Sequence, residues 1–267
     1  MTYSSDFART LVEFLSNFGN GALRPERCDA YPPIREKFDP NDLSRPIHWL
    51  SQPGSGIDFK RTHVPRYIGT VHNWRHGNFW EDGCPEPIIG FPEPLFVLEW
   101  SLWMKPGKTR GTLTGDIMPF FKDLFQTSKG EFGLLCLEAE KERKNFQQIV
   151  EKNGLTQRYI GLDPEFCIPG VYFATIFGKL YVDWFGKDKF ETVPCFKKEW
   201  LRDGSIYIQC SDDLSYYETP DGRHKADEII DHLGRGAFFD LNLPNRTCDV
   251  PDEIKRSRKR TRPSWVD

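Results

Sequence analysis

Two histidines four positions apart, His72 and His76, are the residues of this chain whose types and spacing best suit a metal. His63, Glu81 and Cys84 lie nearby in the sequence, and zinc takes such imidazole, carboxylate and thiolate ligands when three or four converge. The surrounding residues, however, predict a strand that runs into a loop, where this spacing does not bring both rings to one point. We therefore favour a structural role here, and keep a metal-dependent enzyme using His72 and His76 as an alternative.

Other arrangements typical of enzymes are incomplete. Ser55 lies between two glycines, but no strand-turn-helix pattern surrounds it, as a nucleophile elbow requires. Lys141 follows Glu140 directly, a spacing that does not match the carboxylate-and-lysine strand of nucleases. The sequence has neither a phosphate-binding glycine loop nor a dinucleotide fingerprint. We therefore expect a binding protein that is not an enzyme and needs no cofactor.

Two segments combine acidic and aromatic residues, which suits a protein-binding surface. One runs from Ser211 to Gly222 and holds four acids, two adjacent tyrosines and no basic residue, and the other is Phe79-Trp-Glu-Asp82. Acids pair with basic side chains, and exposed tyrosine and tryptophan are common interface anchors. The alternative for the first segment is a solvated loop. The candidate contact residues are Trp80, Glu81, Asp82, Asp212, Asp213, Tyr216, Tyr217 and Glu218.

Charge is distributed unevenly along the chain. The net charge is −3, but residues 255–262 hold six positive charges and no negative ones, so the rest of the chain carries −9. An acidic body favours a basic partner or simply solubility, and argues against direct contact between that body and nucleic acid. We expect residues 254–267 to form a flexible basic tail. A nucleic-acid-associated accessory factor acting through this tail is a second alternative.

The cysteines and the hydropathy pattern predict a cytoplasmic protein. The seven cysteines are odd in number and widely spaced, and Cys136, Cys167 and Cys210 lie in apolar runs, as is typical of buried free thiols. No apolar run approaches the ~18 residues of a membrane helix. The N-terminus lacks the basic and apolar regions of a signal peptide. We therefore expect no membrane partner.

Hydrophobic periodicity predicts helices and strands that do not alternate regularly. Helices are expected over residues 4–18, 33–38, 116–125, 138–152 and 225–233, with Asp116 as a cap. Strands are expected over residues 47–50, 57–60, 66–72, 95–104, 132–137, 196–201 and 205–210. This order predicts an α+β fold, mainly an antiparallel sheet built from hairpins and flanked by about three to four helices. We expect a single domain over residues 1–253.

The most apolar stretch, residues 166–196, is the expected centre of the core. Val171 to Phe177 is rich in β-branched and aromatic residues and predicts a buried strand. Gly178 and Lys179 separate it from a second such run, Leu180 to Phe185. A two-residue break between strand-like runs predicts a hairpin. With the hairpin that follows, residues 168–210 would supply four consecutive antiparallel strands.

The same stretch carries a resemblance to a known family. Ile168-Pro-Gly-Val-Tyr172, Ile176-Phe-Gly178 and Tyr181-Val-Asp-Trp-Phe-Gly186 resemble the central motif of the bacterial immunity protein 52 family. Three further stretches resemble that family too, and together they span most of residues 25–240. They are Tyr31-Pro-Pro-Ile-Arg-Glu-Lys-Phe-Asp-Pro40, the helix near residues 119–125 with Phe132-Gly-Leu-Leu-Cys136, and Ile229-Ile-Asp-His-Leu-Gly234.

The resemblance implies a cytoplasmic antidote that binds and blocks a toxin from a competing or sibling cell. The toxin of such a pair is often a restriction-endonuclease-like nuclease delivered by a type VI-like secretion system. Its active site would be occluded by the acidic, aromatic surface of the immunity protein. The resemblance therefore predicts a basic nuclease as the partner.

Overall fold

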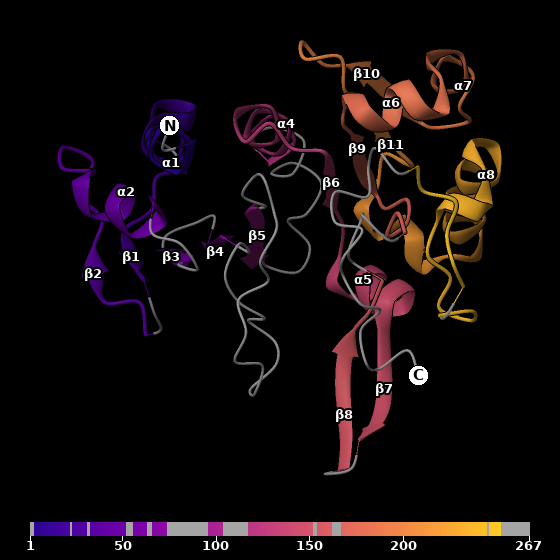
Figure 1. Ribbon diagram of the computed structural model, residues 1–267, viewed down its shortest axis with the longest axis horizontal. Coiled ribbons are helices and arrows are strands. Elements are labelled where there is room, and N and C mark those ends of the chain that lie inside the picture. Colours follow the sequence, from indigo (N-terminus) through magenta and orange to yellow (C-terminus); the bar gives the residue numbers. More distant parts are fainter. Residues whose placement is uncertain are drawn as a thin grey trace. The chain divides into compact units, whose positions relative to one another are not determined.

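The computed structural model describes residues 3–21, 23–30, 33–51, 56–62, 66–73, 96–103, 117–151, 154–161, 167–244 and 246–251. Their fold is α+β with antiparallel sheets, as predicted (Figure 1). The chain divides into two compact units, Met1–Ser128 and Lys129–Asp267. The single domain expected over residues 1–253 stays a prediction.

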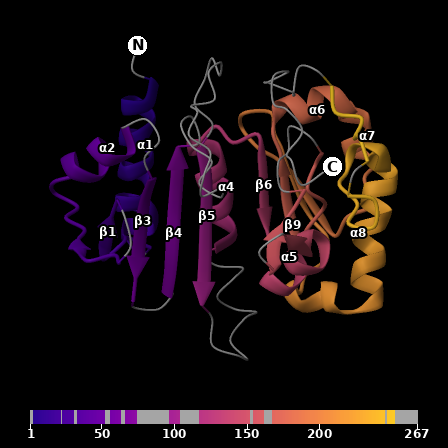
Figure 2. The same ribbon diagram turned by 60° about the horizontal axis from the view of Figure 1, so that its bottom comes forward.

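The first unit is built on a five-stranded sheet of order β2-β1-β3-β4-β5, in which each neighbouring pair is antiparallel. Figure 2 shows β3, β4 and β5 side by side. The strands are β1 (Arg27–Asp29), β2 (Glu36–Lys37), β3 (Gly56–Arg61), β4 (Arg66–Asn73) and β5 (Phe96–Trp103). The helices are α1 (Tyr3–Asn17), η1 (Phe18–Gly21), α2 (Ser44–Ser51) and α4 (Met118–Thr127). The strands expected over residues 57–60, 66–72 and 95–104 are confirmed.

Two predicted elements of the first unit are wrong. Residues 47–50 lie in helix α2, because Pro46 and Leu50, four apart, are both buried, as one helical face requires. The expected helix over residues 33–38 contains strand β2, which pairs with β1 through Cys28 and Glu36. Pro119 lies in the first turn of α4, where its missing N–H does no harm. The N-cap is Ile117 and not the expected Asp116, which falls outside the described residues.

The second unit holds a four-stranded sheet of order β10-β11-β9-β6 and a separate two-stranded sheet, β7-β8. The strands are β6 (Phe132–Leu135), β7 (Phe146–Glu151), β8 (Gly154–Tyr159), β9 (Ala174–Phe177), β10 (Lys197–Trp200) and β11 (Ile206–Gln209). The helices are α5 (Glu138–Asn145), α6 (Lys179–Phe185), α7 (Lys187–Glu191), η4 (Leu214–Glu218), α8 (Pro220–Leu233) and η5 (Arg235–Ala237). The predicted hairpin over residues 196–210 is confirmed as β10-β11.

The expected central hairpin is wrong in its second half, because residues 180–185 form helix α6. Its buried residues, Tyr181, Val182 and Phe185, lie on one helical face, and the rings of Tyr181 and Phe185 both contact Phe177, at 6.3 and 6.2 Å between centroids. On a strand, residues four apart would be about 13 Å apart. Strand β9 pairs instead with β11 and β6, so residues 168–210 supply three strands and not four.

The charged helix expected over residues 138–152 ends earlier than predicted. Helix α5 stops at Asn145, and Phe146 begins strand β7, which pairs with β8. The run Phe146-Gln-Gln-Ile-Val favours a strand because β-branched residues follow the charged turns. The last helix begins earlier, at Pro220, because the hydroxyl of Thr219 accepts a hydrogen bond from Gly222 N and caps it.

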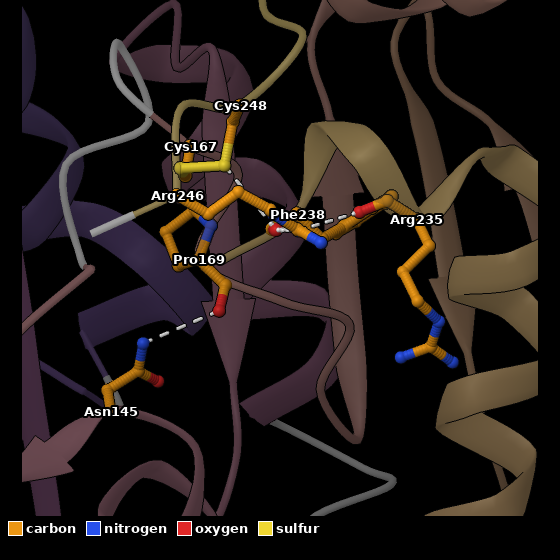
Figure 3. Close-up of a disulfide and its surroundings, with 7 residues drawn as sticks. All are labelled: Asn145, Cys167, Pro169, Arg235, Phe238, Arg246 and Cys248. Atoms are coloured by element: carbon orange, nitrogen blue, oxygen red, sulfur yellow. Dashed lines mark hydrogen bonds between the residues drawn. A yellow bond between two sulfur atoms is a disulfide. The ribbon is translucent and has the colours of Figure 1, made fainter. Parts of the chain in front are cut away.

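Cys167 is not a free thiol, contrary to the prediction, but forms a disulfide with Cys248 (Figure 3). The two residues are 81 positions apart and both are buried. A lone Cys167 in an apolar run gave no hint of a partner so distant. By contrast, Cys136 and Cys210 are free, as expected.

Aromatic side chains fill the core of the second unit. The ring of Phe190 lies 5.4 Å from that of Phe177 and 5.9 Å from that of Phe185, measured between centroids. On one face of the sheet Ile206 and Ile208 belong to the same buried cluster. Loss of a ring at the centre of such a cluster leaves a cavity that the surroundings cannot fill.

We therefore expect Phe190→Ala to lower the free energy of unfolding by about 3–5 kcal/mol, measured by urea denaturation. The matched control is Phe196→Ala, because Phe196 is 58% exposed whereas Phe190 is fully buried. The control should change stability by less than about 0.5 kcal/mol. Equal effects of the two substitutions would contradict this description of the core.

Candidate functional site

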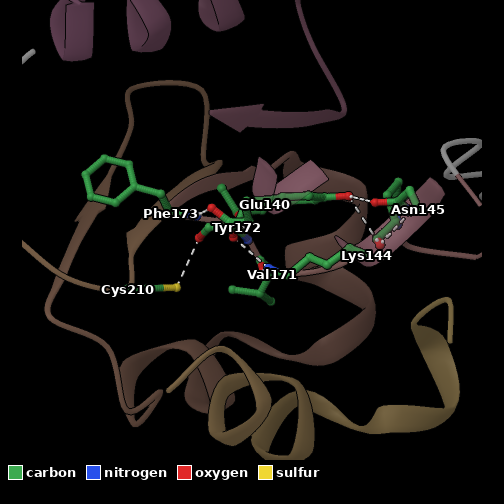
Figure 4. A network of polar contacts seen from close by, with 9 residues as sticks. Glu140, Lys144, Asn145, Val171, Tyr172, Phe173 and Cys210 are labelled. Carbon is green, nitrogen blue, oxygen red and sulfur yellow. Dashed lines mark hydrogen bonds and ion pairs between the residues drawn. The ribbon is translucent and has the colours of Figure 1, made fainter. Parts of the chain in front are cut away.

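A buried polar network connects helix α5 to the segment that precedes strand β9 (Figure 4). Lys144 Nζ donates to Glu140 Oε1 at 2.6 Å and to the carbonyl oxygen of Val171. The other carboxylate oxygen of Glu140 accepts from the backbone N–H of Phe173 at 3.2 Å. The hydroxyl of Tyr172 donates to Asn145 Oδ1 at 2.6 Å. Glu140, Asn145 and Tyr172 are all buried, so these polar groups satisfy one another.

Lys144 also links this network to the loop that carries the predicted contact residues. Its ammonium lies 4.6 Å from the ring centroid of Tyr172 and 4.1 Å from that of Tyr217. Both distances fall within the ~6 Å range of a cation–π contact. Tyr217 therefore holds its loop against α5. The position of Tyr217 in the sequence did not indicate this role.

Burial controls the ionisation of the groups around this network. Desolvation raises the pKa of Glu140 despite the opposing charge of Lys144 and the N–H of Phe173. Burial raises the pKa of Tyr217 to about 12 and that of the Cys210 thiol to about 12. It also raises the pKa of Cys136. Cys136 and Cys210 therefore stay protonated near neutral pH and are poor nucleophiles.

The predicted contact segment, residues 211–222, forms the 3-10 helix η4 and the start of α8. Asp213 is the N-cap of η4, and its Oδ1 accepts from the N–H and the hydroxyl of Ser215 at 3.0 and 2.8 Å. Tyr216 and Tyr217 are partly buried and line, with Glu140, a cavity of about 10 Å³, room for about one water molecule. This cavity is too small for a substrate.

Three carboxylates of the same segment remain available to a partner. Asp212, Glu218 and Asp221 are exposed, and their carboxylates have no hydrogen-bond or ion-pair partner among the described residues. We call these three residues the acidic segment. Asp221 was not among the predicted contact residues, although its place in the same acidic stretch could have indicated it. The carboxylate of Asp213 instead caps η4 within the loop.

Of the other predicted residues, His72 lies on strand β4. Trp80, Glu81, Asp82 and His76 lie outside the described residues. Within the described ranges, no group of three or more His, Cys, Asp or Glu side chains could hold a metal ion. In that same part of the chain, every helix is too short or too polar to cross a bilayer.

Comparison with known proteins identifies no relative: no family model, no curated protein and no solved structure matches the chain.

The raised pKa of Glu140 predicts a pH dependence of stability. Because the folded state holds this proton more tightly than the unfolded chain does, the contribution is fully present below the ordinary value of 4.5 and is lost as the pH rises through the folded-state pKa. Relative to Glu140→Gln, the wild type should lose unfolding free energy as the pH rises through this window. Urea denaturation across the pH range measures it.

Glu142→Gln is the matched control, because Glu142 is an exposed glutamate on the same helix. Its pH profile should run parallel to that of the wild type. If the Glu140→Gln profile were also parallel to that of the wild type, burial would not govern the titration of Glu140.

Proposed function

We propose that the chain is an immunity protein that binds a cognate bacterial toxin, a basic nuclease delivered by a type VI-like secretion system, and occludes its active site. It would act in the cytoplasm and without turnover of its own. The resemblance of residues 168–186 to the immunity protein 52 family supports this proposal, together with the exposed acidic segment. The motif residues are almost all buried, which suits markers of a shared fold.

The acidic segment is the observation that carries the proposal. Residues 211–235 contain seven acids and three Lys or Arg, a net charge of −4. Several acids of α8 are already paired: Asp227 and Asp231 contact Arg235, and Glu228 contacts Lys225. The carboxylates of Asp212, Glu218 and Asp221 are left for a partner. A nuclease must present basic groups to grip phosphates, so its substrate-binding face is complementary to these carboxylates.

The loop that bears the acidic segment is held in one conformation before any partner arrives. Asp213 caps η4, Lys144 holds the ring of Tyr217, and the hydroxyl of Thr219 donates to the carbonyl oxygen of Tyr216 at 2.7 Å. An alanine Cβ at Gly222 would lie only 1.9 Å from that same oxygen, so the backbone of the loop is packed directly on α8. A rigid binding loop loses little conformational entropy on association, which favours tight binding.

Cell survival tests the proposal. Co-expression of this chain with a toxic product of a neighbouring gene should restore growth, and the two proteins should co-purify as a one-to-one complex. Continued cell death without a stable complex would contradict an immunity function. A catalytically inactive toxin variant that still co-purifies would confirm that binding, and not the toxin's activity, brings the two proteins together.

Neutralising the acidic segment should slow capture of the toxin. We expect the triple variant Asp212→Asn, Glu218→Gln, Asp221→Asn to associate about tenfold more slowly at low salt, because it removes charges that steer a basic partner. The difference should shrink as salt screens exposed charges. Stopped-flow or surface-plasmon measurements of the association rate check this.

The matched control changes the net charge equally but elsewhere. Asp6, Glu142 and Asp188 are exposed acids on α1, α5 and α7. Replacing them with Asn, Gln and Asn also removes three negative charges. Asp213 is left intact in both variants because its loss would remove the cap of η4, at a cost of about 1 kcal/mol. Equal slowing in the two triple variants would assign the effect to overall charge and remove the acidic segment as the contact surface.

A further inference from the structure

A short segment near the end of the described chain, residues 246–250, lies across the turn that follows α8. We call it the strap. The guanidinium of Arg246 donates to the carbonyl oxygens of Arg235 and Phe238 (Figure 3). Asp249 N donates to the carbonyl oxygen of Gly236 at 3.0 Å. The disulfide joins Cys248 at the middle of the strap to Cys167.

The strap is a thin cover over the core of the second unit. Cys248 and Val250 are 3% exposed and belong to the buried cluster, whereas their neighbours Thr247 and Asp249 are exposed. Beneath it, Ile168 N donates to the carbonyl oxygen of Ala237, in a single parallel bridge that ties the Ile168 motif to the chain after α8. Three main-chain carbonyls and the buried side chain of Val250 therefore hold the strap besides the disulfide.

The other described cysteines are poorly suited to exchange with this disulfide. Exchange requires a thiolate, and burial raises the pKa of Cys28 to about 11 and that of Cys210 to about 12. Burial raises the pKa values of Cys136 and Cys195 as well. Among the described residues, the disulfide is thus protected from reshuffling, and an external dithiol is the reagent that opens it.

We propose that Cys167 and Cys248 form a redox latch that fastens the strap in an oxidising environment and releases it in a reducing one. A thiolate of an external dithiol attacks one sulfur of the pair and forms a mixed disulfide, and its second thiol then closes on the first. Two electrons pass to the protein, Cys167 and Cys248 each gain a proton, and the dithiol becomes a disulfide. The latch is independent of the proposed toxin binding.

Release of the strap uncovers Phe238 and Cys167, which belong to the buried cluster.

Hydrogen exchange of the full chain, with and without dithiothreitol, tests the latch. Reduction should speed exchange of the amides of Cys248, Asp249 and Ala237 at least about tenfold, while the amides of β9 and β11 keep their protection. Reoxidation should restore the original rates. Unchanged rates at the strap after reduction, or equal acceleration throughout the second unit, would overturn the proposal.

Variants give the same test without a reductant. Cys248→Ser should reproduce the fast strap exchange in a folded protein, and dithiothreitol should then have no further effect on it. Cys195→Ser is the matched control, because it removes a partly buried thiol outside the disulfide and should behave as the wild type. A Cys248→Ser protein that cannot fold would show that the bond is an obligatory staple and would also overturn the latch.

Discussion

The second unit depends on the ion pair between Lys144 and Glu140. Burial of this pair costs desolvation free energy, and hydrogen bonds with the N–H of Phe173 and the carbonyl of Val171 offset part of that cost. The pair thereby fixes the chain that leads into β9, on which the central sheet is assembled. The same ammonium holds Tyr217, so the loop containing η4 and the core share one cation.

This arrangement separates the residues that determine the fold from those available to a partner. Several aromatic and glycine positions of the motif are used in packing: Phe177 contacts both Tyr181 and Phe185, and a Cβ at Gly178 would lie 2.7 Å from the carbonyl oxygen of Glu131. The exposed carboxylates lie on a loop that this core holds rigid. Such a loop can change its surface residues without disturbing the core.

Elements whose hydrophobic pattern fits only a helix or only a strand could be predicted from the sequence. The prediction was wrong where the pattern fits both. Hairpin β10-β11 was predictable because an Asp-Gly turn separates two strand-like runs. Helix α6 was not, since six consecutive largely apolar residues fit a buried strand as well as a helix. In the candidate site, Asp212 and Glu218 are exposed, and their role as contact residues stays a prediction. Asp213 binds Ser215, and Tyr217 packs against Lys144. Both side chains therefore have structural roles, which only the folded chain reveals.

The distance in sequence between the two bonded cysteines has a consequence for biosynthesis. Cys167 leaves the ribosome 81 residues before Cys248, an interval of about 4–16 s at ordinary translation rates. Cys195 and Cys210 are synthesised within that interval, and either could form a disulfide with Cys167 instead. Hairpins form within about 10 μs, so β10-β11 has ample time to pair with β9 and bury Cys210 first. In the folded sheet Cys210 is bound to the backbone of Tyr172 and Phe173, so early closure of this sheet would withdraw Cys210 from competition for Cys167.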